Sequence, residues 1–385
     1  MAHDFFFTEQ QVMIRDLARR IAREKIKPVA AHYDEAEEFP WDIVKILAES
    51  DLCGVYIPEA YGGMGGGVFE QCIVVEELSR ACSGIALAMA ATGLGTFPIL
   101  LCANEEQKKK YLPDIASGKK LAAFAITESE AGSDATALKT TAKKDGDFYV
   151  LNGTKQWITN GGEAETYTVF ASTDPSKGAR GISCFIVEKG TPGFSFGKKE
   201  KKLGIRASAT RELVFENCRV PAANRIEKEG RGLLVAMKTF DASRPGVAAQ
   251  ALGIAQGALD CAVAYARERR QFGQTIASFQ AIQFMLADME IQVQAARCLL
   301  YEVARLTDRG GERSSKFSAI AKTFCSDTAM KVTVDAVQVF GGYGYMREYP
   351  VEKMMRDAKI TQIYEGTNQI QRQEIALALL KEAAQ

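Results

Sequence analysis

Histidine, from which many enzymes build their sites, is scarce in this sequence. Only two histidines, His3 and His32, occur among its 385 residues. This scarcity argues against metal sites built on imidazole and against Ser-His or Cys-His catalysis. If the protein is an enzyme, a carboxylate, a lysine or a bound cofactor must carry the protons and electrons.

Paired cysteines are also lacking. The nine cysteines are odd in number, and no two of them have C-x-x-C spacing. Most stand among apolar residues, as Cys184 and Cys325 do. We therefore expect buried, reduced thiols in a cytosol-like compartment rather than disulfides or a metal centre.

The chain has no excess of charge of either sign. Lys plus Arg and Asp plus Glu each number 48, so the formal net charge is zero. A nucleic-acid or anionic-membrane binder usually has a basic excess, so we expect no nucleic-acid partner. Residues 1–10 contain acidic groups and no apolar segment of a secretory signal follows. We expect a cytoplasmic protein, and a mature mitochondrial-matrix form stays open.

One uncharged run, residues 81–104, is long enough to span a bilayer. It is rich in alanine and contains Gly84, Gly93, Gly95 and Pro98. This composition is more typical of a helix buried in a protein core. We therefore expect no membrane insertion.

The remaining pattern predicts an α+β multidomain fold in three parts. Residues 1–120 read as a helical domain, in which Thr8 and Gln11 form a capping-box start and Pro40 opens a further helix. Residues 121–228 contain short β-forming runs separated by turns, typical of an antiparallel β-barrel or sandwich. Residues 229–385 contain long amphipathic helices and predict a C-terminal helical bundle.

Six local runs carry the chemical information in the sequence. They are residues 124–134 (FAITESEAGSD), 155–161 (KQWITNG), 269–280 (RRQFGQTIASFQ), 338–345 (QVFGGYGY), 355–359 (MRDAK) and 363–368 (IYEGTN). Together and in this order they resemble the acyl-CoA dehydrogenase family over essentially the whole chain. The resemblance is nearest to short- and medium-chain members, including the bacterial butyryl-CoA dehydrogenases.

This resemblance implies a fold, a cofactor and partners. The fold has an N-terminal helical domain, a β-domain and a C-terminal four-helix bundle. The implied enzyme is a homotetramer with one FAD per subunit. It takes an acyl-CoA substrate and passes electrons to an electron-transferring flavoprotein.

The chemistry requires two acceptors for two hydrogens. A base removes the α-proton, and a redox cofactor takes the β-hydrogen as hydride, because no side chain accepts hydride. The resemblance implies that Glu365 is the base and that flavin N5 takes the hydride, which gives the trans-2-enoyl-CoA. The Glu365 backbone N–H and an FAD hydroxyl would stabilise the enolate oxygen. Some relatives carry the base at the position of Ser243, which cannot serve. From spacing alone, Glu365 could also be a solvated residue before the last helix.

The resemblance also implies a set of cofactor contacts. Trp157 would lie against the flavin ring, Ile126, Thr127 and Thr159 at its reactive edge, and Arg269 and Gln280 across a subunit boundary. An ordinary core tryptophan and a solvated helix arginine are the alternatives. The full predicted set is Phe124, Ile126, Thr127, Ser133, Trp157, Ile158, Thr159, Arg269, Phe272, Gln280, Gln338, Val339, Gly341, Gly342, Thr367 and Gln369.

Substrate contacts are implied for Ser133, Asp241, Arg244, Tyr364, Glu365 and Gly366. A helical surface pair is the alternative for Asp241 and Arg244. Residues 84–98 match the acyl-pocket wall and contain no arginine for a distal carboxylate. We therefore expect an apolar acyl group of about four to eight carbons, a branched chain or a ring. An acyl-CoA oxidase that uses O2 and a non-catalytic flavoprotein scaffold are the rival functions.

Overall fold

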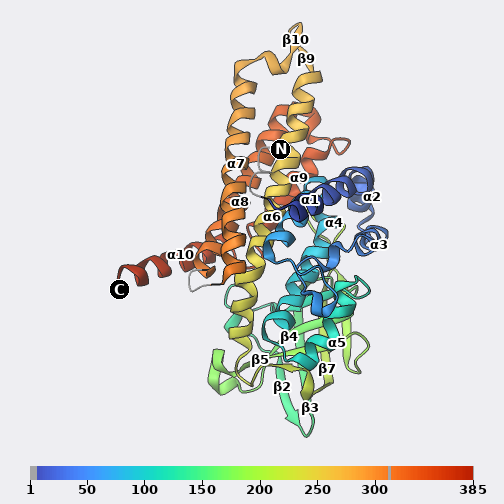
Figure 1. Ribbon diagram of the computed structural model, residues 1–385, viewed down its shortest axis with the longest axis vertical. Coiled ribbons are helices and arrows are strands. Elements are labelled where there is room, and N and C mark those ends of the chain that lie inside the picture. Colours follow the sequence, from blue (N-terminus) through green and yellow to red (C-terminus); the bar gives the residue numbers. More distant parts are fainter. Residues whose placement is uncertain (1–6, 311–313, 385) are drawn as a thin grey trace.

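The computed structural model describes residues 7–310 and 314–384. The β-sheet occupies one end of its long axis, and helices α6 (Gly232–Glu268) and α7 (Gln280–Arg309) run along that axis to a small hairpin at the other end (Figure 1). The last helix extends away from this body. His3 lies outside the described residues.

The N-terminal part is helical, as predicted. Its helices are α1 (Glu9–Ile21), α2 (Ala30–Ala36), α3 (Trp41–Glu49), α4 (Val68–Cys102) and α5 (Glu105–Ala116). The predicted capping box is confirmed, because the Thr8 hydroxyl accepts from the Gln11 N–H at 3.2 Å and the Gln11 side chain accepts from the Thr8 N–H at 3.0 Å. Pro40 stands at the N-terminus of α3, also as predicted.

Most of the uncharged run 81–104 belongs to α4. Extended backbone at Cys82 interrupts this helix, and almost every residue from Cys82 to Ile99 is buried. Helices α4 and α6 (Gly232–Glu268) are both long and apolar enough to span a membrane. In each of them, however, 72% of the apolar window is buried inside the protein, which is the pattern of a core helix.

The middle part forms one large sheet. Its strands are β1 (Ala122–Ala125), β2 (Thr141–Asp145), β3 (Phe148–Thr159), β4 (Thr166–Ser172), β5 (Ile182–Glu188), β6 (Phe194–Lys199), β7 (Thr210–Pro221) and β8 (Arg225–Ile226). The order across the sheet is β6-β7-β3-β2-β4-β5-β8, and β1 pairs with β4.

The sheet differs in one respect from a purely antiparallel one. Strand β4 pairs in parallel with both β1 and β2, and the other pairs within the sheet are antiparallel. Parallel neighbours need long connections. The chain from β1 to its parallel partner β4 accordingly includes β2 and β3, and residues 126–140 connect β1 to β2.

The C-terminal part consists of α6, α7 (Gln280–Arg309), α8 (Ser314–Phe340), α9 (Pro350–Thr361) and α10 (Asn368–Ala383). The short strands β9 (Arg270–Gln271) and β10 (Gln274–Thr275) form the hairpin between α6 and α7. Helix α6 packs against α7, α8 and α9, and also against α4. This packing confirms the predicted bundle and joins it to the N-terminal helices.

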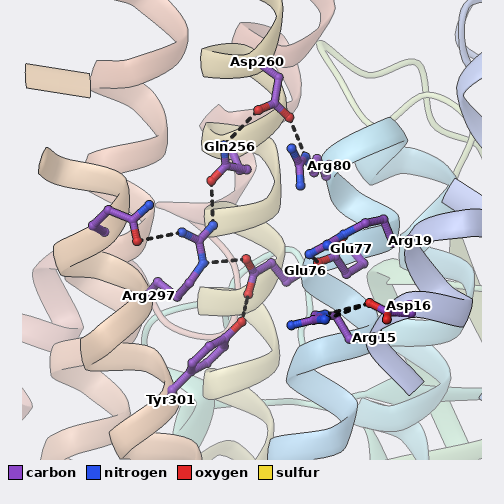
Figure 2. A network of polar contacts seen from close by, with 11 residues as sticks. Arg15, Asp16, Arg19, Glu76, Glu77, Arg80, Gln256, Asp260, Arg297 and Tyr301 are labelled. Atoms are coloured by element: carbon purple, nitrogen blue, oxygen red, sulfur yellow. Dashed lines mark hydrogen bonds and ion pairs between the residues drawn. The ribbon is translucent and has the colours of Figure 1, made fainter. Parts of the chain in front are cut away.

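A buried polar network ties α4, α6 and α7 together (Figure 2). The Glu76 carboxylate of α4 accepts hydrogen bonds from Arg297 Nε at 2.9 Å and Tyr301 OH at 2.8 Å, both on α7. Arg297 also donates to the Gln256 side chain of α6 at 2.7 Å. Because both charges are buried and paired, this network fixes the mutual position of three helices.

Candidate active site

A cavity of 380 Å³ lies where the three parts meet. Helix α4, the 126–136 segment, the end of β3, helix α6 and the turn before α10 all contribute to its lining. The predicted residues along this cavity are Phe124, Ile126, Thr127, Ser133, Trp157, Ile158, Thr159, Arg244, Tyr364, Glu365 and Gly366. The structure thus brings together residues that are up to 242 positions apart in the chain, from Phe124 to Gly366.

Glu365 stands in the sharp turn between α9 and α10. Its φ is +53° and that of Gly366 is +89°, so two successive residues adopt the left-handed conformation. A non-glycine residue there is strained and must be held by its surroundings. The Glu365 carbonyl accepts from Gln371 Nε2 at 3.0 Å and from Arg244 Nε at 3.3 Å, which provides that support.

The Glu365 side chain is half-buried and reaches the cavity. The Ser243 hydroxyl donates to its Oε2 at 2.5 Å. Burial raises the pKa of Glu365, and the Ser243 hydrogen bond, Arg244 and Lys322 only partly oppose that rise. Among the described residues no cation is paired directly with this carboxylate, because Arg244 binds Glu374 through two hydrogen bonds of 2.6 and 3.0 Å. The carboxylate is therefore placed to accept a proton.

Two polar neighbours of Glu365 were not predicted in their observed roles. Ser243 stands at the alternative base position considered above, and its hydroxyl donates a hydrogen bond to the Glu365 carboxylate. Lys322 of α8 is fully buried and donates to the Gly366 carbonyl at 2.8 Å and to Asn368 Oδ1 at 2.9 Å. Burial lowers its pKa to about 7. The signal for Lys322 was available, since it lies on the helical face that also carries Ser318, Cys325 and Ala329.

Trp157 reaches the cavity through an irregularity in β3. The register of β3 against β7 shifts between Lys155 and Ile158, and Trp157 has a φ of +57°. A bulge of this kind redirects a side chain out of the sheet. Trp157 is accordingly 56% exposed, so the alternative of an ordinary core tryptophan is wrong.

The 126–140 segment is held in place by a buried ion pair. Glu128 accepts hydrogen bonds from Lys155 Nζ at 2.8 Å, from the Lys139 N–H at 2.6 Å and from Thr140 through both its N–H at 3.0 Å and its hydroxyl at 2.5 Å. Lys155 also donates to the Ile126 carbonyl at 3.0 Å. Burial opposes the ionisation of Glu128, but Lys155 and the other donors outweigh it, so its pKa lies below the usual range.

Several other predicted cofactor residues lie elsewhere. Arg269, Val339, Gly341 and Gly342 line a separate open cavity of 550 Å³ near the β9–β10 hairpin, which has no lining residue in common with the first cavity. The hairpin lies at the opposite end of the molecule from the β-domain (Figure 1). One chain therefore does not bring both sets of predicted cofactor residues together.

The remaining predicted residues have exposed or peripheral positions. Phe272, in the hairpin, is 92% exposed, and Gln280, Gln338 and Gln369 are exposed as well. The Thr367 side chain caps α10 by accepting from the Ile370 N–H at 3.3 Å. Asp241 lies on α6 close to Arg244 but does not line the first cavity.

Comparison with known proteins gives a consistent identification. Three family models match in succession: the N-terminal domain of acyl-CoA dehydrogenase at residues 8–119, its middle domain at 123–218 and its C-terminal domain at 230–380. An acyl-CoA dehydrogenase of Bacillus subtilis is 50% identical over 374 residues, which cover 97% of this chain and 98% of the relative.

Solved structures agree with these matches. The structure of butyryl-CoA dehydrogenase from Megasphaera elsdenii has a TM-score of 0.95 at 47% identity and covers 97% of this chain and 99% of its own. A chain from a structural study of the electron-transferring flavoprotein of Acidaminococcus fermentans and flavin-based electron bifurcation has a TM-score of 0.95 at 51% identity, and the match covers 97% of this chain and 98% of that one. The chain therefore belongs to the acyl-CoA dehydrogenase family of flavin-dependent oxidoreductases.

Proposed function

We propose that the protein converts an apolar acyl-CoA thioester to its trans-2-enoyl-CoA, with Glu365 as the base that removes the α-proton. One observation carries this proposal. A half-buried carboxylate with a raised pKa faces a cavity that also contains Thr127, Trp157 and Thr159. A base whose pKa is raised toward the working pH is suited to removing a weakly acidic proton.

FAD is the cofactor of this family, and the residues present fit it. Trp157 offers an exposed aromatic face beside the two threonine hydroxyls of the first cavity. In the second cavity, Gly341 and Gly342 have no atom within 4 Å of the position that a Cβ would take, so a ligand can approach the backbone closely. When bound, FAD supplies the acceptor for the β-hydrogen.

The turn at Glu365 also offers a donor for the thioester oxygen. The Glu365 backbone N–H has no hydrogen-bond acceptor within residues 7–310 and 314–384. A fixed N–H aimed at the developing oxyanion makes the α-proton more acidic. The hydrogen bonds that Gln371 and Arg244 donate to the Glu365 carbonyl keep this peptide unit in place.

The wall of the cavity supports an apolar acyl group. Helix α4 contributes only uncharged side chains between residues 87 and 97, namely Leu87, Ala90, Ala91, Leu94 and Phe97. Gly246 on α6 also lines the cavity, and no atom lies within 4 Å of the position that its Cβ would take. A distal carboxylate would be desolvated there without a partner, which is costly. The similarity to a butyryl-CoA dehydrogenase supports a short chain.

We further propose an electron-transferring flavoprotein as the electron acceptor and a homotetramer as the assembly. The first proposal is supported by the similarity to a chain from a structure described as that of an electron-transferring flavoprotein. The two separate sets of predicted cofactor residues support a second subunit, because FAD can contact both sets only if another subunit brings the second to the first, and the family resemblance supports four subunits.

Anaerobic titration with acyl-CoA thioesters tests the function. Straight, branched and ring-containing apolar acyl-CoAs should bleach the yellow protein, and glutaryl-CoA should bleach it poorly. A protein that stays colourless after FAD is added would contradict the flavoenzyme function. A yellow protein that no acyl-CoA bleaches would favour the scaffold, and rapid reoxidation by air after bleaching would favour the oxidase.

A further inference from the structure

The run Met355 to Lys359 has no part in the chemistry above, yet two of its side chains hold a loop behind the acyl cavity. This loop is residues 203–207, between β6 and β7. On α9, Arg356 Nη1 donates to the Leu203 carbonyl at 3.1 Å. Asp357 Oδ1 accepts the Ile205 N–H at 2.5 Å. Asp357 is buried, and Lys353 Nζ binds its other oxygen at 2.5 Å.

Ile205 needs such support because its backbone is strained. Its φ is +46°, a conformation that is rare for a β-branched residue. The loop also has no room on either side. A Cβ on Gly204 would lie 2.5 Å from the backbone of Arg356, and one on Gly84 would lie 3.3 Å from Ile205. The loop is therefore pressed between α9 and α4.

The Ile205 side chain supports the acyl wall from behind. It is 4% exposed and packs in one cluster with Leu87 and Ala91, and Ile360 and Tyr364 pack against this cluster. Leu87, Ala91 and Tyr364 line the cavity, whereas Ile205 does not. Ile205 thus lies directly outside two wall residues and the residue that precedes Glu365.

We propose that Asp357 is a positioning residue that sets the depth of the acyl pocket, by holding Ile205 as a wedge behind Leu87, Ala91 and Tyr364. The inference rests on the proposed function, because it concerns the acyl group that the cavity receives. Protein interiors are closely packed, so removing the wedge lets the wall move outward. The pocket should then accept longer chains relative to short ones.

Variants Ile205→Ala and Asp357→Asn test this inference in the full-length, FAD-loaded protein. The measurement is the ratio of kcat/KM for octanoyl-CoA to that for butanoyl-CoA. We expect Ile205→Ala to raise this ratio about tenfold, the discrimination that one methylene commonly gives in an apolar pocket. Asp357→Asn should shift it in the same direction, because the amide cannot both accept the Ile205 N–H and remain an ion-pair partner of Lys353.

Glu76→Gln is the matched control, because it also removes a buried, paired carboxylate but lies in the network between α4 and α7 (Figure 2). It should lower the melting temperature and leave the ratio within about twofold of the wild type. Ile205→Val, which removes one methyl group, should give a smaller shift in the same direction and decides the question if the alanine variant does not fold.

The possible results distinguish a failure of this inference from a failure of the proposed function. A wild type that oxidises no acyl-CoA would overturn the proposed function and this inference with it. A wild type that works, together with folded, FAD-containing Ile205 variants whose ratio is unchanged, would overturn the inference alone. A ratio that shifts equally in Glu76→Gln would also overturn it, because the shift would then follow stability rather than the wedge.

Discussion

Two carboxylates at the candidate site have opposite environments: Glu365 lines the cavity, and Glu128 lies behind it in the 126–140 segment, which contributes other residues to the wall. Glu128 is 6% exposed and accepts four hydrogen bonds, one of them from the buried Lys155. Glu365 is half-buried, and within residues 7–310 and 314–384 its carboxylate accepts one hydrogen bond, from the neutral Ser243. The pKa of Glu128 is lowered and that of Glu365 is raised. Pairing, rather than burial, distinguishes the carboxylate that braces the site from the one that is free to react.

The largest expected effect comes from Glu365→Gln. Glutamine keeps the shape of the side chain but cannot take a proton, so anaerobic bleaching by an acyl-CoA should slow by about 10²–10⁴-fold. FAD content and acyl-CoA binding should be retained. Stopped-flow absorbance at the flavin band measures the rate.

Glu130→Gln is a suitable control for this experiment, because Glu130 is an exposed acid in the same 126–140 segment as Glu128. It should bleach at the wild-type rate. If Glu365→Gln also bleaches at the wild-type rate, Glu365 is not the base. The difference in pKa between the two carboxylates would then have no part in the reaction.

Glu128→Gln should act on stability instead. Removing one partner of a buried ion pair leaves the other charge uncompensated, which costs about 3–5 kcal/mol. We expect a loss of this size in the free energy of unfolding at pH 7, measured with denaturant, and a lower FAD content. The bleaching rate per bound flavin should change far less than in Glu365→Gln. A loss below about 1 kcal/mol would contradict the role of Glu128 as a brace.

The stability effects of Glu128→Gln and Glu365→Gln should also change in opposite directions with pH. The lowered pKa of Glu128 means that its contribution to stability is present above its unfolded pKa and is lost as the pH falls through the folded value. The raised pKa of Glu365 means that its contribution is complete below the unfolded pKa and is lost as the pH rises through the folded value. From acid to neutral pH, Glu128→Gln should therefore become more destabilising relative to the wild type, and Glu365→Gln less so.

Ser243→Ala should have the smallest effect. It removes the hydrogen bond that opposes the rise in the pKa of Glu365, so the acid limb of kcat/KM should move to higher pH. Rates on that limb should fall about tenfold and rates above it should change little, as expected for one hydrogen bond to a charged group. Ser243→Thr keeps a hydroxyl and is the control. An acid limb that does not move would show that Ser243 does not tune Glu365.

Local sequence signals predicted the elements where neighbours along the chain decide the structure. The Thr8 capping box and the helix start after Pro40 depend on residues within one turn, and both are confirmed. The parallel pairing of β1 with β4 was not predicted, because its partners, such as Ala122 and Thr166, belong to segments separated by two other strands. The outward turn of Trp157 depends on a register shift against β7, which a single strand does not reveal.

In the candidate site, too, some features could be predicted from the sequence and others depend on packing. The sequence by itself limited the available chemistry: with only two histidines, a carboxylate, a lysine or a cofactor must do the work, and the resemblance carried by the six ordered runs implies Glu365 and a flavin. Only the tertiary structure decided which carboxylate is paired. Ser243 and Glu365 are 122 positions apart and Glu128 and Lys155 are 27 apart, and each pair meets only when its elements pack. The sequence specifies the residue types, whereas desolvation and ion pairing, which set the reactivity of a carboxylate, arise from packing.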